Sequence, residues 1–449
     1  MSPRAEPPER EHADRGEYRL LWLRLLTYSL LLLAATPAIA CYLLWRSLFR
    51  RRPLGPWRDR LGLVPRVAGS GGPRIWLHAV SAGEVMAAQP VLEALRAALP
   101  SARIAMSSVT AAGMSLARRS CQADAFFYLP LDGPGCMGRA LARLRPQLLV
   151  VTEKELWPNL LGLARLSGAK VLVVNGRVSD RMMKRARWAR GFVQWLYSLP
   201  HHFCVQSEQD ARRLRRLGLP DHRVTVSGNT KVDSLAAPGS SPAERLASDL
   251  GISGDEVWVV AGSTHAGEEQ AALAAFRRLR SAVPRARLLL APRHLERVPA
   301  VAALVAAQGW PVARRSDGRP ASPEAIVVLD TMGELRDAYR SAAVAFVGGT
   351  LVPVGGHNLL EPTAAGRAVL FGPHTENCSD VADLVVESGV GFRVRDADDL
   401  AQQLIRIAGD PRLRVDIAAA ARVLIARQRG AARRCAEVAC ALLGQESAP

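Results

Sequence analysis

Ile75-Trp-Leu-His-Ala-Val-Ser-Ala-Gly-Glu84 is the stretch that decides the fold. Its first six residues are apolar and partly β-branched, which favours a buried parallel strand that ends at Ser81-Ala-Gly83. From Glu84 onward the apolar residues recur at helical spacing, so we expect Glu84 in the first turn of a helix. In open α/β sheets, ligands bind at the carboxyl ends of the strands, which is where this carboxylate should lie.

Two interpretations of Glu84 stay open from this pattern. A glutamate in the first turn of a helix can simply interact favourably with the helix dipole. It can also serve as a base in a reaction. The helix N-terminus would then lower the pKa of the Glu84 carboxyl group and make it a weaker base.

The composition predicts two α/β domains and an anionic partner. The chain has 449 residues, a length that is too great for one ordinary core. Of these residues 49% are hydrophobic and 36 are glycine, as in α/β proteins. The formal net charge of +18 indicates nucleic acid, anionic lipid or a phosphorylated substrate as partner. Only four of the 59 basic residues are lysine, so a single arginine says little about function. The seven cysteines are scattered without a Cys-x-x-Cys pair, which implies no zinc site and favours a reducing compartment.

The N-terminal part predicts a membrane anchor. Residues 1–24 form a polar tail, and residues 25–45 contain no charged residue, which is long enough to span a bilayer as a helix. The larger number of arginines after this run favours a cytoplasmic globular part. A cleaved signal peptide is the alternative, but the apolar run continues beyond the small residues Ala38-Ile-Ala40. A helix inserted obliquely into the membrane surface also stays open, and we expect the segment to lie outside both domain cores.

Two domains of alternating strands and helices are expected, at residues 53–233 and at residues 244–449, the latter with C-terminal helices. The strands expected in the first domain are 74–80, 103–108, 125–129, 147–151, 170–175, 202–205 and 223–226. Those expected in the second are 257–261, 287–291, 325–329, 343–347 and 368–371. Residues 232–244 are rich in serine, alanine, proline and glycine, which is typical of a linker. This rhythm predicts a doubly wound parallel sheet in each domain.

Chemistry-bearing residues of the first domain follow its expected strands. Glu153 and Glu155 come directly after one strand, at the same sheet edge as Glu84, and are either a paired-acid site or two solvated loop acids. Lys231 ends the domain. It is either a surface lysine or a cation that meets a phosphate or a carboxylate.

The second domain carries the strongest local signal of the chain, a glycine-rich loop. Gly348-Gly-Thr350 leads through Gly355-Gly-His-Asn358 to Glu361. The glycines let backbone N–H groups approach a ligand, and a following helix N-terminus favours an anion. Two other strands end at His265 and at Pro292-Arg-His294. The histidines lack metal-ligand spacing, so we expect no metal site.

Taken together, these motifs resemble the bacterial 3-deoxy-D-manno-octulosonic acid (Kdo) transferases. The resemblance rests on seven motifs in order: His78-Ala-Val-Ser-Ala-Gly-Glu84, Glu153-Lys-Glu-Leu-Trp-Pro-Asn159, Gly228-Asn-Thr-Lys231, Ser263-Thr-His-Ala-Gly-Glu268, Pro292-Arg-His294, Asp330-Thr-Met-Gly-Glu334 and Gly355-Gly-His-Asn-Leu-Leu-Glu361. Enzymes of this family are inverting glycosyltransferases of the GT-B type, with two Rossmann-like domains facing a cleft and an N-terminal membrane anchor. They transfer Kdo from CMP-Kdo to a lipid A precursor, lipid IVA, in lipopolysaccharide core biosynthesis.

The resemblance also implies roles for single residues. Glu84 would be the general base, and Glu153 and Lys231 would help to stabilise the transition state. CMP would be held by Pro292, Arg293, Met332, Gly333, Glu334, Asn358, Leu359, Leu360 and Glu361. Lys154 stands where a threonine is expected, which leaves open whether Glu153 or Glu155 has the acidic role. Leu359 replaces an expected proline, which leaves the shape of the CMP loop open.

The partners implied by the resemblance are CMP-Kdo, a lipid A precursor and the inner membrane, with the catalytic domains on the cytoplasmic side. We expect no cofactor, no metal and no nucleic acid. Two alternatives stay open: a related GT-B transferase that uses a UDP-sugar, and a membrane-tethered protein that binds anions or nucleic acid without catalysis. Aromatic residues make up only 5% of the chain and are not interleaved with basic ones, which argues against a single-strand binder.

Overall fold

The computed structural model describes residues 19–36, 56–67, 71–178, 182–183, 188–235, 246, 248–251, 256–318 and 320–445. Most of the expected polar tail, the second half of the expected anchor and most of the expected linker therefore lie outside the described residues. The chain divides into two units. The first comprises Met1–Ser234 and Gln428–Pro449, and the second comprises Leu235–Arg427.

The first unit is built on a parallel sheet of seven strands, in the order β3-β2-β1-β4-β5-β6-β7. The strands are β1 (Arg74–His78), β2 (Arg103–Ser108), β3 (Ala125–Tyr128), β4 (Leu148–Thr152), β5 (Lys170–Gly176), β6 (His202–Val205) and β7 (Val224–Val226). The helices are α2 (Trp57–Arg60), α3 (Ala82–Ala98), α4 (Ala111–Ser120), α5 (Pro134–Leu144), α6 (Pro158–Leu166), α8 (Arg190–Ser198), α9 (Glu208–Arg216), α10 (Lys231–Leu235) and α19 (Ala431–Leu443). All seven strands lie where the sequence predicts them.

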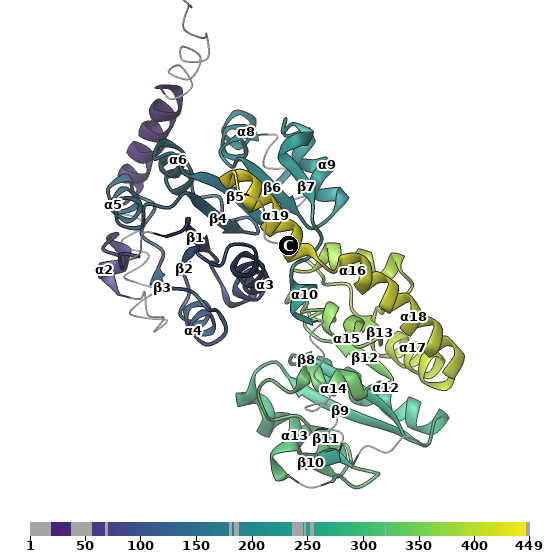
Figure 1. The fold of residues 1–449 in the computed structure, drawn as a ribbon. Coiled ribbons are helices and arrows are strands. Elements are labelled where there is room, and N and C mark those ends of the chain that lie inside the picture. Colours follow the sequence, from purple (N-terminus) through teal and green to yellow (C-terminus); the bar gives the residue numbers. More distant parts are fainter. Residues whose placement is uncertain are drawn as a thin grey trace, which may run out of the picture. The chain divides into compact units, whose positions relative to one another are not determined.

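Helices cover both faces of this sheet (Figure 1). Alternate residues of a strand point to opposite faces, so Ile75 and Leu77 of β1 pack with α3, α4 and α19, whereas Trp76 packs with α5 and α6. All five residues of β4 are buried. A strand that is buried on both faces reads as a continuous apolar run, which is why the pattern predicts these strands well.

The expected second domain at residues 244–449 includes the C-terminal helix. In the structure this helix belongs to the first unit instead. Helix α19, drawn in yellow in Figure 1, packs its Cys435 and Ala439 into the core of the first unit against α3. The Asp233 carboxylate fixes the start of α19, because it accepts hydrogen bonds from the backbone N–H groups of Gly430 and Ala432, both at 2.7 Å. The second unit therefore ends at Arg427.

The second unit repeats the architecture with a parallel sheet in the order β10-β11-β9-β8-β12-β13-β14. Its strands are β8 (Val257–Thr264), β9 (Ala286–Pro292), β10 (Val312–Arg314), β11 (Ile326–Val328), β12 (Val344–Val347), β13 (Ala368–Phe371) and β14 (Gly391–Arg393). Its helices are α12 (Glu268–Ala282), α13 (Val298–Ala307), α14 (Leu335–Ser341), α15 (Leu360–Ala364), α16 (Ser379–Glu387), α17 (Ala397–Gly409) and α18 (Pro411–Gln428), the last of which ends at the unit boundary. The sequence misses β10 and β14, two edge strands of three residues each.

Each sheet has a point where the strand order reverses direction. In the first sheet it lies between β1 and β4, and in the second between β8 and β12. Ligands of doubly wound sheets bind outside the carboxyl ends of the strands at this switch point. The residues that directly follow these four strands are therefore the first place to look for a site. The cleft expected between the two domains stays a prediction.

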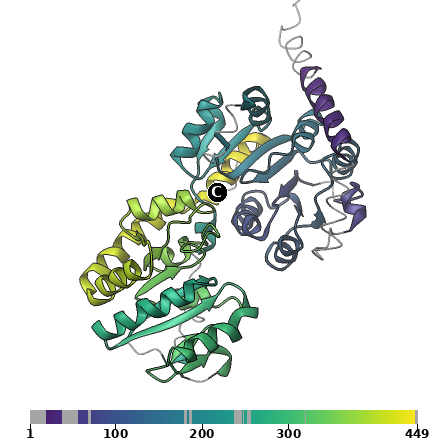
Figure 2. The same cartoon turned by 180° about the vertical axis from the view of Figure 1, so that it is seen from behind.

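The N-terminal helix, residues 19–36, begins six residues before the predicted apolar run and is long and apolar enough to cross a membrane. It lies beside α5 and α6 in both views (Figures 1 and 2). Leu25 is only 2% exposed and belongs to the core that covers one face of the first sheet. A Cβ atom at Gly162 of α6 would lie 2.6 Å from Leu25, so the missing side chain makes room for this contact. The expectation that the segment lies outside both cores is therefore wrong for Leu25.

Two polar contacts extend this docking of the N-terminal helix. The Tyr28 hydroxyl donates to Asp132 Oδ2 at 3.1 Å, and the Ser29 hydroxyl donates to Asn159 Oδ1 at 3.0 Å. Asp132 also accepts from the backbone N–H of Leu160 at 2.9 Å, in the first turn of α6. The N-terminal helix is thus fixed to the same turn that follows the acidic loop after β4.

Leu25→Ala should lower the free energy of unfolding by about 2 kcal/mol or more, because it removes a buried side chain from a packed slot. Leu26→Ala is the matched control, since Leu26 is 55% exposed and its loss should cost less than about 0.5 kcal/mol. Urea unfolding of the full chain in mild detergent measures both. Equal midpoints for the two variants would show that the helix does not pack on the first unit.

Candidate functional site

Glu84 lies at the switch point of the first sheet. Strand β1 ends at His78, and helix α3 starts at Ala82. Glu84 therefore lies in the first turn of the helix, close to the carboxyl end of the strand. Its Oε2 accepts a hydrogen bond from the backbone N–H of Val80 at 2.8 Å, and the residue is only 8% exposed. The carboxyl group is therefore held in place by the chain that leads into its own helix.

Burial raises the pKa of the Glu84 carboxyl group to about 8. This value includes smaller upward contributions from the negative charges of Glu153 and Glu155, and downward ones from the Val80 N–H and the Lys231 ammonium group. The sequence predicts the opposite direction from the helix N-terminus alone. That expectation is wrong because desolvation of a carboxylate outweighs the field of one helix end.

Glu153 and Lys231 form an ion pair beside Glu84. Lys231 Nζ lies 2.8 Å from Glu153 Oε1, and the side chain of Glu153 is 11% exposed. Glu153 follows β4 with a φ of 62°, a left-handed conformation that is unusual for a residue with a side chain. Strained backbone of this kind persists where the surrounding structure imposes it, often at functional sites. The structure pairs Glu153 with Lys231, and among the described residues no ion pair is found for Glu155.

Buried amide side chains hold this ion pair, and the sequence analysis does not identify them. Asn175, at the end of β5, has a φ of 53°, and its Nδ2 lies 3.4 Å from Glu153 Oε1 while its Oδ1 accepts from the Thr230 N–H at 3.0 Å. Asn229 Oδ1 accepts from the Lys231 N–H at 3.1 Å. The Thr230 hydroxyl donates to the carbonyl of Ala87 in α3 at 2.7 Å. The available signal is that the strand from Lys170 ends in a polar residue at the same sheet edge.

The first unit thus brings its predicted residues together. Glu84, Glu153 and Lys231 follow β1, β4 and β7, and the charges of Glu153 and Lys231 act on the pKa of Glu84. One carboxyl group has a raised pKa and lies beside a second carboxylate that is paired with an ammonium group. Such a set can accept a proton at Glu84 while Lys231 offers a positive charge to a forming anion.

Glu268 organises the switch point of the second unit, although the sequence analysis assigns it no role. Its carboxylate is fully buried and accepts four backbone N–H groups, from His265, Gly349, Thr350 and Leu351, at 2.7 to 2.9 Å. These residues follow β8 and β12, the two strands at the switch point. The Glu268 carboxylate therefore connects the segment after β8 to the glycine-rich loop after β12 and holds that loop in one shape.

A pair of histidines lies on this loop. His265 Nε2 and His357 Nε2 are 2.8 Å apart, and the two rings stack with an interplanar angle of 6°. Burial lowers the pKa of His357 to about 4, and the nearby charge of Arg293 lowers it further. A neutral pair can share one proton between the two nitrogen atoms. Ser263, just before His265, has a φ of 56°, which is a third strained position at a strand end.

Six of the nine predicted CMP residues gather at this edge. Pro292 ends β9, and the exposed Arg293 that follows acts electrostatically on both His357 and Glu361. Burial raises the pKa of Glu361, while a hydrogen bond from Asn358 Nδ2 at 3.0 Å opposes this shift. The side chains of Leu359 and Leu360 are buried, so only their backbone groups can face a ligand.

The remaining three residues, Met332 to Glu334, follow β11, which neighbours β9 in the sheet. Met332 is 76% exposed, and Gly333 adopts a φ of 92°. Arg315 Nη2 lies 3.1 Å from Glu334 Oε1, and Thr331 also donates to the Glu334 carboxylate. An exposed methionine beside a strand end can pack on a flat ring, and the structure places it on the predicted edge of the sheet.

Metal ligands are not clustered in the part of the chain that the structure describes. Within it, no group of three or more histidine, cysteine, aspartate or glutamate side chains fits a metal ion. The expectation that no metal takes part stays a prediction.

Comparisons with known proteins agree with the motifs. A family model described as 3-deoxy-D-manno-octulosonic-acid transferase (kdotransferase) matches residues 56–234. A 3-deoxy-D-manno-octulosonic acid transferase from Bordetella pertussis is 34% identical over 427 residues, which cover 91% of this chain and 96% of that protein. The one from Haemophilus influenzae is 31% identical over 84% of this chain and 89% of its own length.

Solved structures agree with the fold class. The UDP-GlcNAc 2-epimerase from Neisseria meningitidis, solved with bound UDP-GlcNAc, has a TM-score of 0.58 at 11% identity, over 82% of this chain and 99% of that chain. At this identity the likeness shows the fold alone. It confirms the expected class of two Rossmann-like units.

Glu268→Gln should lower the free energy of unfolding by about 3 kcal/mol, because the amide NH₂ group would face two of the four N–H donors and the charge would be lost. Glu387→Gln, an exposed change on α16, is the control and should cost less than about 0.5 kcal/mol. Urea unfolding gives the cost, and amide exchange of residues 349–351 shows its place. Unchanged protection of these amides would contradict the role assigned to Glu268.

Proposed function

Because the chain belongs to the 3-deoxy-D-manno-octulosonic acid transferases, which are glycosyltransferases, we propose that it transfers Kdo from CMP-Kdo to a lipid A precursor, lipid IVA, in lipopolysaccharide biosynthesis. The donor, the acceptor and the pathway are the proposed parts. The observation that carries the proposal is the Glu84 group: a buried carboxyl with a pKa of about 8 beside the Glu153–Lys231 ion pair.

Glu84 accepts the proton of the acceptor hydroxyl group. The oxygen of this hydroxyl group attacks the anomeric carbon of Kdo and forms the new C–O bond, while the bond from that carbon to the CMP phosphate breaks. The bonding electrons leave with CMP, and the hydroxyl proton passes to the Glu84 carboxylate. Attack from the side opposite the leaving group inverts the anomeric centre. A base with a pKa near the working pH suits this task, because it both accepts and releases a proton readily.

Lys231 and Glu153 act on charge that develops during the transfer. Lys231 can stabilise the negative charge on a reacting oxygen, and Glu153 holds its ammonium group in position. The strained backbone of Glu153 and Asn175 and the buried amides around them keep the pair in one geometry. This supports Glu153, and not Glu155, as the second acid.

The donor nucleotide is assigned to the second unit. The phosphate of CMP needs a positive charge, which the exposed Arg293 directly after β9 can supply. Met332 and Gly333 at the neighbouring strand end suit the flat cytosine ring. Asn358 and Glu361, which bond to each other, offer polar groups to the same ligand.

Two alternatives differ from this proposal by measurable properties. A related transferase would use a UDP-sugar, so CMP and UDP would compete differently for the donor site. A membrane-tethered anion or nucleic-acid binder would show salt-dependent binding without turnover. Curated relatives named as Kdo transferases across most of the chain favour the Kdo donor.

The proposed location is the cytoplasmic face of the inner membrane, with the N-terminal helix as anchor. Leu25 and Ser29 of this helix contact the first unit, and the chain rejoins the same unit at α2, where Asp59 accepts from the Tyr128 N–H at 2.9 Å. A chain that leaves and returns to one side crosses the membrane an even number of times. Two crossings need about 40 residues, and only residues 30–55 are available. We therefore favour a helix that lies in the membrane surface.

Mass spectrometry of lipid IVA after incubation with CMP-Kdo and the full chain tests the proposal directly. We expect the mass of lipid IVA to increase by one or more Kdo units, and no increase with UDP-sugars. Transfer from a UDP-sugar in place of CMP-Kdo would overturn the donor assignment.

Glu84→Gln should reduce turnover by roughly 10²-fold or more, the scale of general-base catalysis, because it removes the proton acceptor and keeps the shape. CMP binding should change by less than about twofold, since the donor residues lie in the second unit. Turnover and CMP affinity are measured side by side. Near-normal turnover would show that Glu84 is not the base and that it interacts only with the helix N-terminus.

The pH profile of kcat/KM should rise through an apparent pKa near 8, because Glu84 accepts a proton only when it is ionised. Glu155→Gln should move this rise to lower pH, since the Glu155 charge raises the pKa of Glu84. Glu208→Gln, an exposed change on α9, should leave it in place. A rise that stays unchanged in Glu155→Gln would assign the ionisation to another group.

A further inference from the structure

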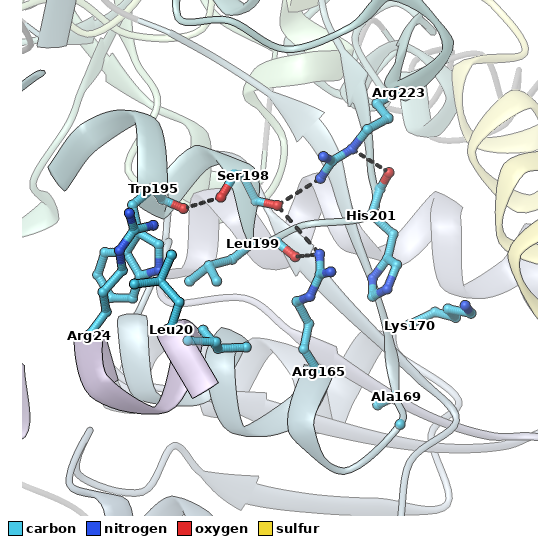
Figure 3. A pocket seen from close by; sticks show the side chains of 12 residues that line it. Leu20, Arg24, Arg165, Ala169, Lys170, Trp195, Ser198, Leu199, His201 and Arg223 are labelled. Atoms are coloured by element: carbon cyan, nitrogen blue, oxygen red, sulfur yellow. Dashed lines mark hydrogen bonds between the residues drawn. The ribbon is translucent and has the colours of Figure 1, made fainter. Parts of the chain in front are cut away.

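A cavity of about 360 Å³ opens at the edge of the first sheet that is opposite the Glu84 group. It is lined by Leu20 and Arg24 of the N-terminal helix, by Arg165 at the end of α6, by Lys170 at the start of β5 and by Arg223 after α9. Figure 3 shows these side chains around one space. We infer that this cavity binds the phosphate headgroup of an anionic membrane lipid.

The cavity concentrates positive charge without a counterion. Four cationic side chains line it, and among the described residues no aspartate or glutamate does. Arg165 and Arg223 donate only to neutral backbone carbonyls, for example to Leu199 at 3.1 Å and to Ser198 at 2.8 Å. These bonds, drawn as dashed lines in Figure 3, fix the direction of both guanidinium groups, and a neutral carbonyl does not compensate a positive charge.

His201 also lines the cavity, and its pKa is affected by the positive charges around it. Burial lowers its pKa to about 4, and the charges of Arg165, Lys170 and Arg223 lower it further. Arg223 itself has a lowered pKa through burial and through the charge of Arg165. Like charges held this close gain stability when an anion lies between them.

The acceptor does not explain this cavity. Lys170 begins β5, and Gly176 ends it at the edge where Glu84 and Glu153 lie. Seven residues of strand span about 20 Å, so a phosphate in the cavity is too far from the reacting hydroxyl for one disaccharide acceptor to reach both. The cavity is therefore a separate site.

The N-terminal helix identifies the source of the phosphate. Its Leu23, Leu26, Leu30 and Leu31 are more than half exposed, and Trp22 lies among them. If this helix lies in the membrane surface, as proposed above, its apolar side chains enter the lipid and Arg24 lies at headgroup level. The inference thus rests on the proposed placement of this helix, and it does not depend on Kdo transfer.

Flotation of the full chain with vesicles tests the site in the absence of any substrate. The vesicles are phosphatidylcholine with or without phosphatidylglycerol. Lys170→Glu and Arg24→Glu should each lower binding to the anionic vesicles by roughly fivefold or more, and binding to neutral vesicles by less than about twofold. Both side chains are exposed, so the changes leave the core intact. Lys170→Arg keeps the positive charge, so this variant should bind the anionic vesicles as well as the unchanged protein does.

Arg412→Glu is the matched control, because Arg412 is exposed on α18 of the second unit and the change in net charge is the same. An equal loss in Arg412→Glu would assign the effect to net charge and overturn the site, as would no loss in Lys170→Glu. Inorganic phosphate that replaces chloride at constant ionic strength should release less than half of the bound protein. Complete release would identify a site for free phosphate and overturn the lipid assignment. Because no donor or acceptor is present, every outcome is independent of the transferase activity.

Discussion

A parallel sheet places the carboxyl ends of all its strands along one edge, and both candidate sites depend on that constraint. In the first unit, the segments after β1, β4, β5 and β7 meet at this edge, which is how Glu84, Glu153, Asn175 and Lys231 come together from positions far apart in the chain. In the second unit, the segments after β8 and β12 meet in the same way. The strand order reverses at both places, so helices diverge there and leave room for a ligand.

Three glutamates at the carboxyl edges of the two sheets show how the environment sets the behaviour of one side chain. Glu84 has one N–H donor and lies near two other carboxylates, so burial raises its pKa to about 8. Glu153 has an ammonium partner at 2.8 Å. Glu268 has four N–H donors and no solvent contact, which makes it part of the scaffold of a loop. The same residue type thereby has a raised pKa at one position, an ammonium partner at the second and a purely structural set of hydrogen bonds at the third.

The two edges of the first sheet have different electrostatic characters. The carboxyl edge carries acids, amides and two lysines, Lys154 and Lys231, and the backbone of Glu153 and Asn175 is strained there. The opposite edge carries Arg165, Lys170 and Arg223 around a cavity that the N-terminal helix completes. That helix also contacts Asn159, in the turn that follows Glu153 and Glu155. One helix thus contacts both the cavity of the proposed lipid site and the turn that follows the Glu153 loop.

The sequence by itself determined the two-unit α/β fold, because central strands of covered parallel sheets are continuous apolar runs. It also indicated the apolar N-terminal helix, and the site residues that it predicted follow the expected strands, while their roles stay a prediction. The edge strands Val312–Arg314 and Gly391–Arg393 were not predicted, because each ends in an arginine and contains at most two apolar residues. The assignment of α19 to the first unit becomes visible only in the folded chain, since the alanine-rich face of that helix does not specify its partner. The tertiary structure alone paired Lys231 with Glu153, 78 positions away, and reversed the expected pKa shift of Glu84. Burial depends on residues that are distant in the chain, and burial is the largest cause of the pKa shift of Glu84.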